Sequence, residues 1–282
     1  MLTLWLLLAC STAPAALPDP SAAAAPEPAL VVEPPPPVPV WPAPGAPLRL
    51  LEAPPPKERA LRLVIDAGHG APGNLGNTSV RCEAEADFTR RTQDAVVARL
   101  AGSAGLEVKA GRPTEALRSY DARIATFNAW PADAVISLHS DTRAGDGWSR
   151  SPTTGCWEGH GATGFAVLYS DSGKSSLVEA RLRLARAVAL RMVEAGLPAY
   201  GGGDYPGLYD PDPQVPGVFV DRHAPGKTIR MLRATQVPLV IVETHQAVDP
   251  DEAARWDEPA TLHAFASAIR AATLDAGPAG RI

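Results

Sequence analysis

Three apolar stretches of the sequence run into a side chain that can bind a metal ion or carry a proton. Each stretch has the length and composition of a buried strand. They are 61–69, ending in His69, 133–139, ending in His139, and 237–243, ending in Glu243. Because ligands of open α/β sheets bind beyond the carboxyl ends of the strands, we expect these three side chains to converge although they lie far apart in the sequence.

A further acidic group is available in the segment "RCEAEADFT", which carries Glu83, Glu85 and Asp87 at the start of a predicted helix. The helix N-terminus favours the ionised form of a carboxyl group there. Two histidines and one carboxylate, with a position left for water, form a usual ligand set of hydrolytic zinc sites. A free carboxylate such as Glu243 then suits the general base. Each residue alone also fits a structural role, such as a turn, a helix-end charge or a buried ion pair, so the prediction depends on their joint occurrence.

Apolar periodicity predicts the elements that position these groups. The expected strands are one that starts at residue 61 and those at 105–111, 133–139, 164–170 and 237–243; the expected helices cover 85–100, 119–130, 175–195 and the segment that starts at Pro259. Strands alternate with helices. The sequence therefore predicts an α/β fold with a single, mostly parallel or mixed sheet, helices on both faces and the zinc site at the carboxyl ends of the strands.

Four motifs together resemble the zinc-dependent N-acetylmuramoyl-L-alanine amidases that act on cell walls. They are, in order, "VIDAGHG", "EADFT", "SLHSD" and "VPLVIVETHQAVDPDEA", and the resemblance covers about residues 61–275. It implies that His69, Glu85 and His139 bind Zn²⁺ and that Glu243 is the catalytic glutamate. The implied reaction is hydrolysis of the amide bond between N-acetylmuramic acid and the L-alanine of the stem peptide, with peptidoglycan as the substrate.

The chain departs from the family's pattern beside these motifs. Asp141 stands where asparagine is usual, and His245 replaces part of a Gly-Phe pair. Both are candidate substrate-binding residues, although His245 fits an exposed loop equally well. Arg222 is a third candidate, for contact with a stem-peptide carboxylate, with a surface charge as the alternative. By analogy with relatives in which an inserted segment blocks the site, the loop 198–228 is expected to line or gate the glycan groove, with a protein activator as a possible partner.

The three cysteines are typical of an exported protein. Cys10 ends the segment "MLTLWLLLAC", which resembles a signal peptide closing in a bacterial lipobox. We therefore expect lipidation of Cys10, which would anchor the chain to a membrane. Cys82 and Cys156 remain as an even pair, and they either form a disulfide that ties two loops together or are two separate buried thiols.

Composition divides the chain into three parts. More than half of the 30 prolines fall at or before residue 56. The Pro/Ala-rich segment 11–58 is expected to be a disordered tether between the signal or lipobox segment 1–10 and a catalytic domain over 59–282. The net charge is −5 and no run of Lys and Arg occurs, so no nucleic-acid partner is expected. We expect an exported protein of the periplasm or cell envelope that acts in wall remodelling or septum cleavage.

Two other functions remain open at this point. One is a different zinc amide hydrolase, such as a carboxypeptidase acting on wall peptides. The other is a non-catalytic, wall-binding lipoprotein on an amidase scaffold. The four chemical groups favour the enzyme. The departures at His245 and at Ala71, which replaces the second glycine after the histidine motif, keep the binding protein in consideration.

Overall fold

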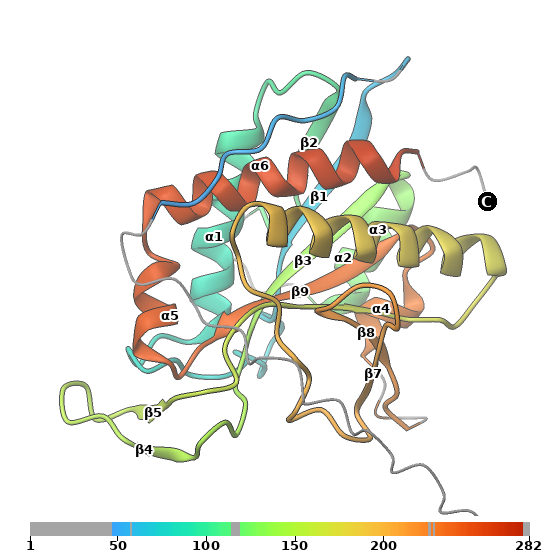
Figure 1. Cartoon of the computed structure of the whole chain (residues 1–282). Coiled ribbons are helices and arrows are strands. Elements are labelled where there is room, and N and C mark those ends of the chain that lie inside the picture. Colours follow the sequence, from blue (N-terminus) through green and yellow to red (C-terminus); the bar gives the residue numbers. More distant parts are fainter. Residues whose placement is uncertain (1–46, 57, 114–118, 225–226, 228, 279–282) are drawn as a thin grey trace, which may run out of the picture. The chain divides into compact units, whose positions relative to one another are not determined.

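The computed structural model describes residues 47–56, 58–113, 119–224, 227 and 229–278. Within these residues, seven strands form one sheet: β1 (Leu61–Ala67), β2 (Leu106–Ala110), β3 (Ala134–Asp141), β6 (Ala166–Tyr169), β7 (Tyr209–Pro211), β8 (Val218–Asp221) and β9 (Leu239–Gln246). The order is β2-β1-β3-β9-β6-β8-β7 (Figure 1). A separate hairpin consists of β4 (Trp148–Arg150) and β5 (Trp157–Gly159).

The sheet is mixed, as predicted. β2, β1, β3 and β9 pair in parallel, β6 is antiparallel to β9 and parallel to β8, and β7 is antiparallel to β8. The three strands that carry the predicted chemical groups, β1, β3 and β9, are therefore adjacent and run in the same direction. Their carboxyl ends lie at one edge of the sheet.

Helices cover both faces of the sheet, which confirms the predicted architecture. One face packs on α1 (Glu85–Leu100), α3 (Ser175–Glu194) and α6 (Pro259–Ala276), around a core that includes Ile65, Leu138, Val242 and Phe265. The opposite face packs on α2 (Tyr120–Ala129) and α4 (Arg230–Ala234). The short helix α5 (Pro250–Arg255) follows β9. Strands buried on both faces explain the nearly continuous apolar runs of β1, β3 and β9.

The structure also contains short elements that the sequence did not predict. These are β4, β5, β7, α4 and α5, each of three to six residues. Segments of that length carry too few residues to show a periodicity. The long elements agree closely with prediction, and α1 covers the predicted range of residues 85–100.

The N-terminal predictions fall mostly outside the described residues. The segment 1–10, with Cys10, and the tether up to residue 46 are not among them. Residues 47–56, which the sequence assigned to the tether, pack on the domain instead. The backbone N–H of Arg49 donates to the carbonyl of Ala195 (3.1 Å), and that of Leu51 donates to Oγ of Ser267 (3.0 Å). Ordered packing of this segment therefore begins before the predicted boundary at residue 59. Among the described helices, none has both the length and the apolar character needed to cross a bilayer.

Candidate metal centre

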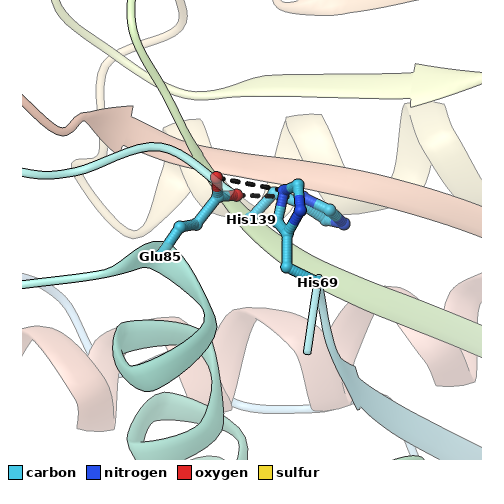
Figure 2. Close-up of side chains that lie close together, drawn as sticks. All are labelled: His69, Glu85 and His139. Atoms are coloured by element: carbon cyan, nitrogen blue, oxygen red, sulfur yellow. Dashed lines mark hydrogen bonds and ion pairs between the residues drawn. The ribbon is translucent and has the colours of Figure 1, made fainter. Parts of the chain in front are cut away.

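Two imidazoles and one carboxylate meet at the carboxyl ends of β1 and β3 (Figure 2). Nε2 of His69 lies 3.0 Å from Oε2 of Glu85, and Nδ1 of His139 lies 3.0 Å from Oε1 of the same carboxylate. The potential ligand atoms of the three residues all lie within 4.8 Å of one another. Two nitrogens and one oxygen at this spacing fit the donor set of a hydrolytic zinc site.

Glu85 is the first residue of α1, and its side chain is buried. Besides the two imidazoles, its carboxylate accepts hydrogen bonds from the backbone N–H groups of Asn77 (3.0 Å) and Ser140 (3.1 Å). Burial alone would raise the pKa of Glu85, but the bonds from His139 and His69 outweigh it and hold the pKa well below its usual range. The lowered pKa favours the ionised form of this carboxyl group, which suits a cation.

His69 adopts a left-handed backbone conformation, with φ of 55°, which is uncommon for a residue with a side chain. A buried ion pair between Asp66 and Arg123 (3.1 Å) lies beneath it. The guanidinium of Arg123 also donates to the carbonyl oxygens of Ala67 (2.5 Å) and His69 (3.0 Å). Arg123 thus holds the backbone on both sides of the turn. Sequence reasoning left the role of Asp66 open and did not identify Arg123, because 57 residues separate the two.

A side chain from the following loop fixes the orientation of the His69 ring. Nδ1 of His69 lies 2.8 Å from Oδ1 of Asn74, and the amide group of Asn74 donates to the hydroxyl of Tyr120 (3.0 Å). An amide oxygen can only accept, so Nδ1 of His69 donates in this contact, and Nε2, on the other side of the ring, faces Glu85. Such outer contacts commonly orient the histidine ligands of metals.

Two glycines leave the space that these ligands occupy. A Cβ atom at Gly68 would collide with the ring of His139, and one at Gly76 would collide with Glu85 and His69. Gly76 also has φ of 77°. Any side chain at either position would therefore displace a ligand.

Glu243 lies on β9 directly beside His139 on β3. Adjacent strands are about 4.8 Å apart, and register partners in a parallel pair point to the same side of the sheet. Oε2 of Glu243 is buried and receives no hydrogen bond from the described residues. Burial, together with the negative charges of Asp141 and Glu85, raises the pKa of Glu243 well above its usual value. A carboxyl group in this environment is suited to accepting a proton.

Asp141 lies at the end of β3, close to Glu243, but Oδ2 of its carboxylate already has two side-chain donors. Nε of Arg143 donates to Oδ2 (2.9 Å), and the hydroxyl of Tyr205 donates to the same oxygen (2.5 Å). Arg143 is buried and was missed by the sequence analysis, because it lies after the end of β3, where no periodicity indicates the direction of a side chain. Arg143 and Tyr205 thus hold the side chain of Asp141 in place beside Glu243.

The structure does not bring His245 to the ligands. Between the register partners of His139 and Asp141, β9 contains one residue more than β3. This β-bulge reverses the alternation of side chains. The ring of His245 therefore enters the core between Phe88 and Trp256, with centroid distances of 4.9 and 5.8 Å, and His245 is only 2% exposed. Neither predicted position, at the substrate or in an exposed loop, is correct.

Arg222 also lies away from the metal centre. It forms ion pairs with Asp171 (2.8 Å) and Asp210 (2.5 Å). It follows β8, which runs antiparallel to the direction of β9 because β8 is parallel to β6. The carboxyl end of β8 thus points away from the edge where β1, β3 and β9 end, so the expected contact of Arg222 with substrate at this edge is not supported.

Cys82 and Cys156 form a disulfide with a Cα–Cα distance of 5.6 Å. This bond joins the loop that leads into Glu85 to the β4–β5 hairpin. Of the two alternatives that the sequence left open, the structure contains the disulfide that ties two loops together.

Comparisons with known proteins show the family and the fold of the chain. A model of the N-acetylmuramoyl-L-alanine amidase family matches residues 63–274.

The solved N-acetylmuramoyl-L-alanine amidase from Clostridium difficile 630 is 19% identical over 77% of this chain and 96% of that chain, with a TM-score of 0.56. The apo form of Ami1 from Mycobacterium abscessus is 21% identical over 76% and 97%, also with a TM-score of 0.56. The CwlD amidase from Clostridioides difficile, solved in complex with the GerS lipoprotein, is 14% identical over 75% and 95%, with a TM-score of 0.51. No curated protein sequence matches this chain. At these identities the solved structures show a shared fold.

Proposed function

The chain belongs to the N-acetylmuramoyl-L-alanine amidase family, and on this basis we propose that it hydrolyses the amide bond between N-acetylmuramic acid and L-alanine in peptidoglycan, with zinc as its cofactor. One observation carries the proposal most directly. The donor atoms of His69, Glu85 and His139 lie within 4.8 Å of one another, beside a carboxyl group without a hydrogen-bond donor on Oε2.

The three residues suit zinc because they combine two imidazole rings with one carboxyl group whose pKa is held well below its usual range. A zinc ion held there supplies a Lewis acid for the substrate carbonyl and lowers the pKa of water. Gly68 and Gly76 keep the space around these ligands free of side chains.

Glu243 acts as the general base and then as the general acid in this proposal. Its Oε2 takes a proton from the attacking water, and the same atom delivers that proton to the departing amine of L-alanine. The raised pKa of Glu243, caused first by burial and then by Asp141 and Glu85, favours the first transfer. Arg143 and Tyr205 hold the side chain of Asp141 in place close to this base.

The proposed setting is the cell envelope. We propose that the chain is exported, lipidated at Cys10 and tethered by its Pro/Ala-rich segment. A wall hydrolase that is anchored in a membrane needs such a tether to reach the peptidoglycan mesh beyond it. A protein activator is also proposed, with support from the CwlD structure, which contains the GerS lipoprotein.

Digestion of purified peptidoglycan tests the activity. We expect glycan strands without stem peptides, together with intact stem peptides that start with L-alanine. Clipped stem peptides would instead indicate a peptidase, and release of neither product would indicate a wall-binding protein. Metal analysis of the same preparation should give zinc, which His139→Ala should lose.

Glu243→Gln tests the base. We expect it to retain zinc and to lower kcat by about 10²- to 10⁴-fold, the usual contribution of a positioned acid/base group. Glu179→Gln, which changes an exposed carboxylate on α3, is the matched control and should leave kcat unchanged. Full activity of the Glu243→Gln variant would exclude the proposed mechanism.

A further inference from the structure

The β4–β5 hairpin presents two tryptophans on one face. In its antiparallel register Trp148 pairs with Gly159, and Arg150 pairs with Trp157. Alternation along the strands therefore places Trp148, Arg150 and Trp157 on the same face. The two indoles are 44% and 43% exposed, whereas most large apolar side chains of the described residues are buried. Their ring centroids lie 6.5 Å apart.

The geometry of this face is fixed by specific contacts. Nε1 of Trp148 donates to the carbonyl of Arg143 (2.7 Å), which anchors one edge of the indole and leaves its surface exposed. A Cβ atom at Gly159 would collide with the ring of Trp148, so the glycine lets that ring lie across the partner strand. The guanidinium of Arg150 stacks on Trp157 at 4.0 Å from the ring centroid. An exposed aromatic pair that is held in one orientation loses little entropy when it binds a flat ligand.

The hairpin is fastened to the rim of the metal centre. It follows β3, the strand that carries His139, after a short connection (Figure 1). The Cys82–Cys156 disulfide ties it to the loop that leads into Glu85. The hydroxyl of Thr154 donates to the carbonyl of Val80 (2.6 Å) in the same loop. The aromatic face is thus continuous with the elements that hold two of the three metal ligands.

We propose that Trp148 and Trp157 form a stacking surface for the sugar rings of a glycan strand. A pyranose ring has an apolar face of C–H groups with hydroxyl and amide groups at its edges. Indoles offer the matching flat, electron-rich surface, and Arg150 supplies hydrogen-bond donors at its border. This inference rests on the proposed function. In its substrate the stem peptide is attached to a glycan strand, so sugars lie on both sides of the amide bond that is hydrolysed. The hairpin then selects polymeric substrate over short fragments.

Binding to purified sacculi, stripped of protein and lipid, tests this surface. The full chain carrying Glu243→Gln is used, so that the polymer stays intact. We expect Trp157→Ala to raise the half-saturation concentration about tenfold, which corresponds to the loss of roughly one aromatic stacking contact. Trp157→Phe should retain most of the affinity. Leu190→Ala, an exposed apolar residue on α3, is the matched control and should bind as before.

Activity separates this inference from the proposed function. With Glu243 intact, Trp157→Ala should cleave a short N-acetylmuramoyl-peptide at the wild-type rate and sacculi about tenfold more slowly. The inference would be overturned if Trp157→Ala bound sacculi as tightly as wild type, or if Leu190→Ala lost as much affinity for sacculi as Trp157→Ala. It would also be overturned if Trp157→Ala lost as much rate on the short substrate as on sacculi. Tryptophan-dependent binding to phosphatidylglycerol vesicles but not to sacculi would overturn it as well. If the wild-type chain cleaves nothing, the proposed function fails while the binding measurement still decides the role of the tryptophans.

Discussion

The backbone conformation of His69 depends on residues that lie outside the candidate metal centre. Its left-handed backbone is held by Arg123, whose charge is balanced in the protein interior by Asp66. Both side chains of this pair are completely buried. Removing one member of such a pair leaves an uncompensated charge in the interior, which is far more costly than the loss of an exposed pair.

We therefore expect Asp66→Asn to lower the free energy of unfolding by about 3–5 kcal/mol and to weaken zinc binding by His69. Urea denaturation and competition with a zinc chelator measure the two effects. Asp121→Asn, which removes the exposed partner of Arg230, is the matched control and should cost about 1 kcal/mol at most. Equal losses in the two variants would argue against a special role for the Asp66–Arg123 pair.

His245 gives the folded protein a pH dependence. Burial, together with the positive charges of Arg143 and Arg91, lowers its pKa to about 3 from the ordinary histidine value of about 6.5. The folded state therefore keeps this ring neutral while the unfolded chain takes up a proton below pH 6.5. The unfolded state binds more protons in this window, so the contribution of His245 to stability is present above pH 6.5 and is lost as the pH falls toward 3.

The expected slope from His245 is about 1.4 kcal/mol of unfolding free energy per pH unit within this window. His245→Phe, which keeps an aromatic ring between Phe88 and Trp256, should flatten the dependence between pH 4 and pH 6 by about that amount. His263→Gln, at an exposed position of α6, should not flatten it. The measurement is urea denaturation at several pH values, and parallel curves for wild type and His245→Phe would contradict the assignment.

At the scale of elements, the disulfide connects the hairpin to the loop before α1 across a separation of 74 residues. Closing a loop of that length in the unfolded chain removes conformational entropy worth about 4 kcal/mol. The double variant Cys82→Ser/Cys156→Ser should lose stability of that order. Reduced wild type should show the same loss in denaturation, whereas the double variant should not respond to reductant. A double variant as stable as oxidised wild type would mean that the bond does not constrain the chain.

An irregularity in β9 determines which of its side chains face the candidate site. Strict alternation along its apolar run would place His245 on the same side as Glu243. The β-bulge turns His245 to the other side, into the core below α1. Glu243 remains beside His139, because the bulge lies after it. One extra residue in the strand therefore separates the proposed base from a second imidazole.

For the whole molecule, the segment before β1 is a part of the folded domain. Leu48 and Leu51 are partly buried and pack against the core. The backbone N–H of Arg49 donates to the end of α3, and that of Leu51 donates to Ser267 of α6. A chain that starts at Pro47 should therefore be more stable than one that starts at Arg59, by about 2 kcal/mol for two half-buried leucines. Thermal unfolding of the two truncated chains measures the difference. Equal midpoints would show that the packing of this segment contributes nothing.

The sequence by itself determined the long elements and which four side chains stand at their ends as candidates for metal binding and proton transfer. His69, Glu85, His139 and Glu243 stand at the ends of long apolar or amphipathic segments, whose period and length fix strands and helices locally. Parallel neighbours then bring those ends to one edge, which is a general property of α/β sheets. For this reason four residues spread over much of the chain could be assigned to one site.

Only the tertiary structure decided what surrounds that site. Arg123, Arg143 and Tyr205 act through partners that are distant in sequence or lie in irregular loops, and no periodicity marks such contacts. The bulge that redirects His245 depends on pairing between two strands, and the position of Arg222 depends on the direction of β8. Whether Cys82 meets Cys156 depends on where two loops end in space. These features follow from long-range geometry, which a linear pattern does not encode.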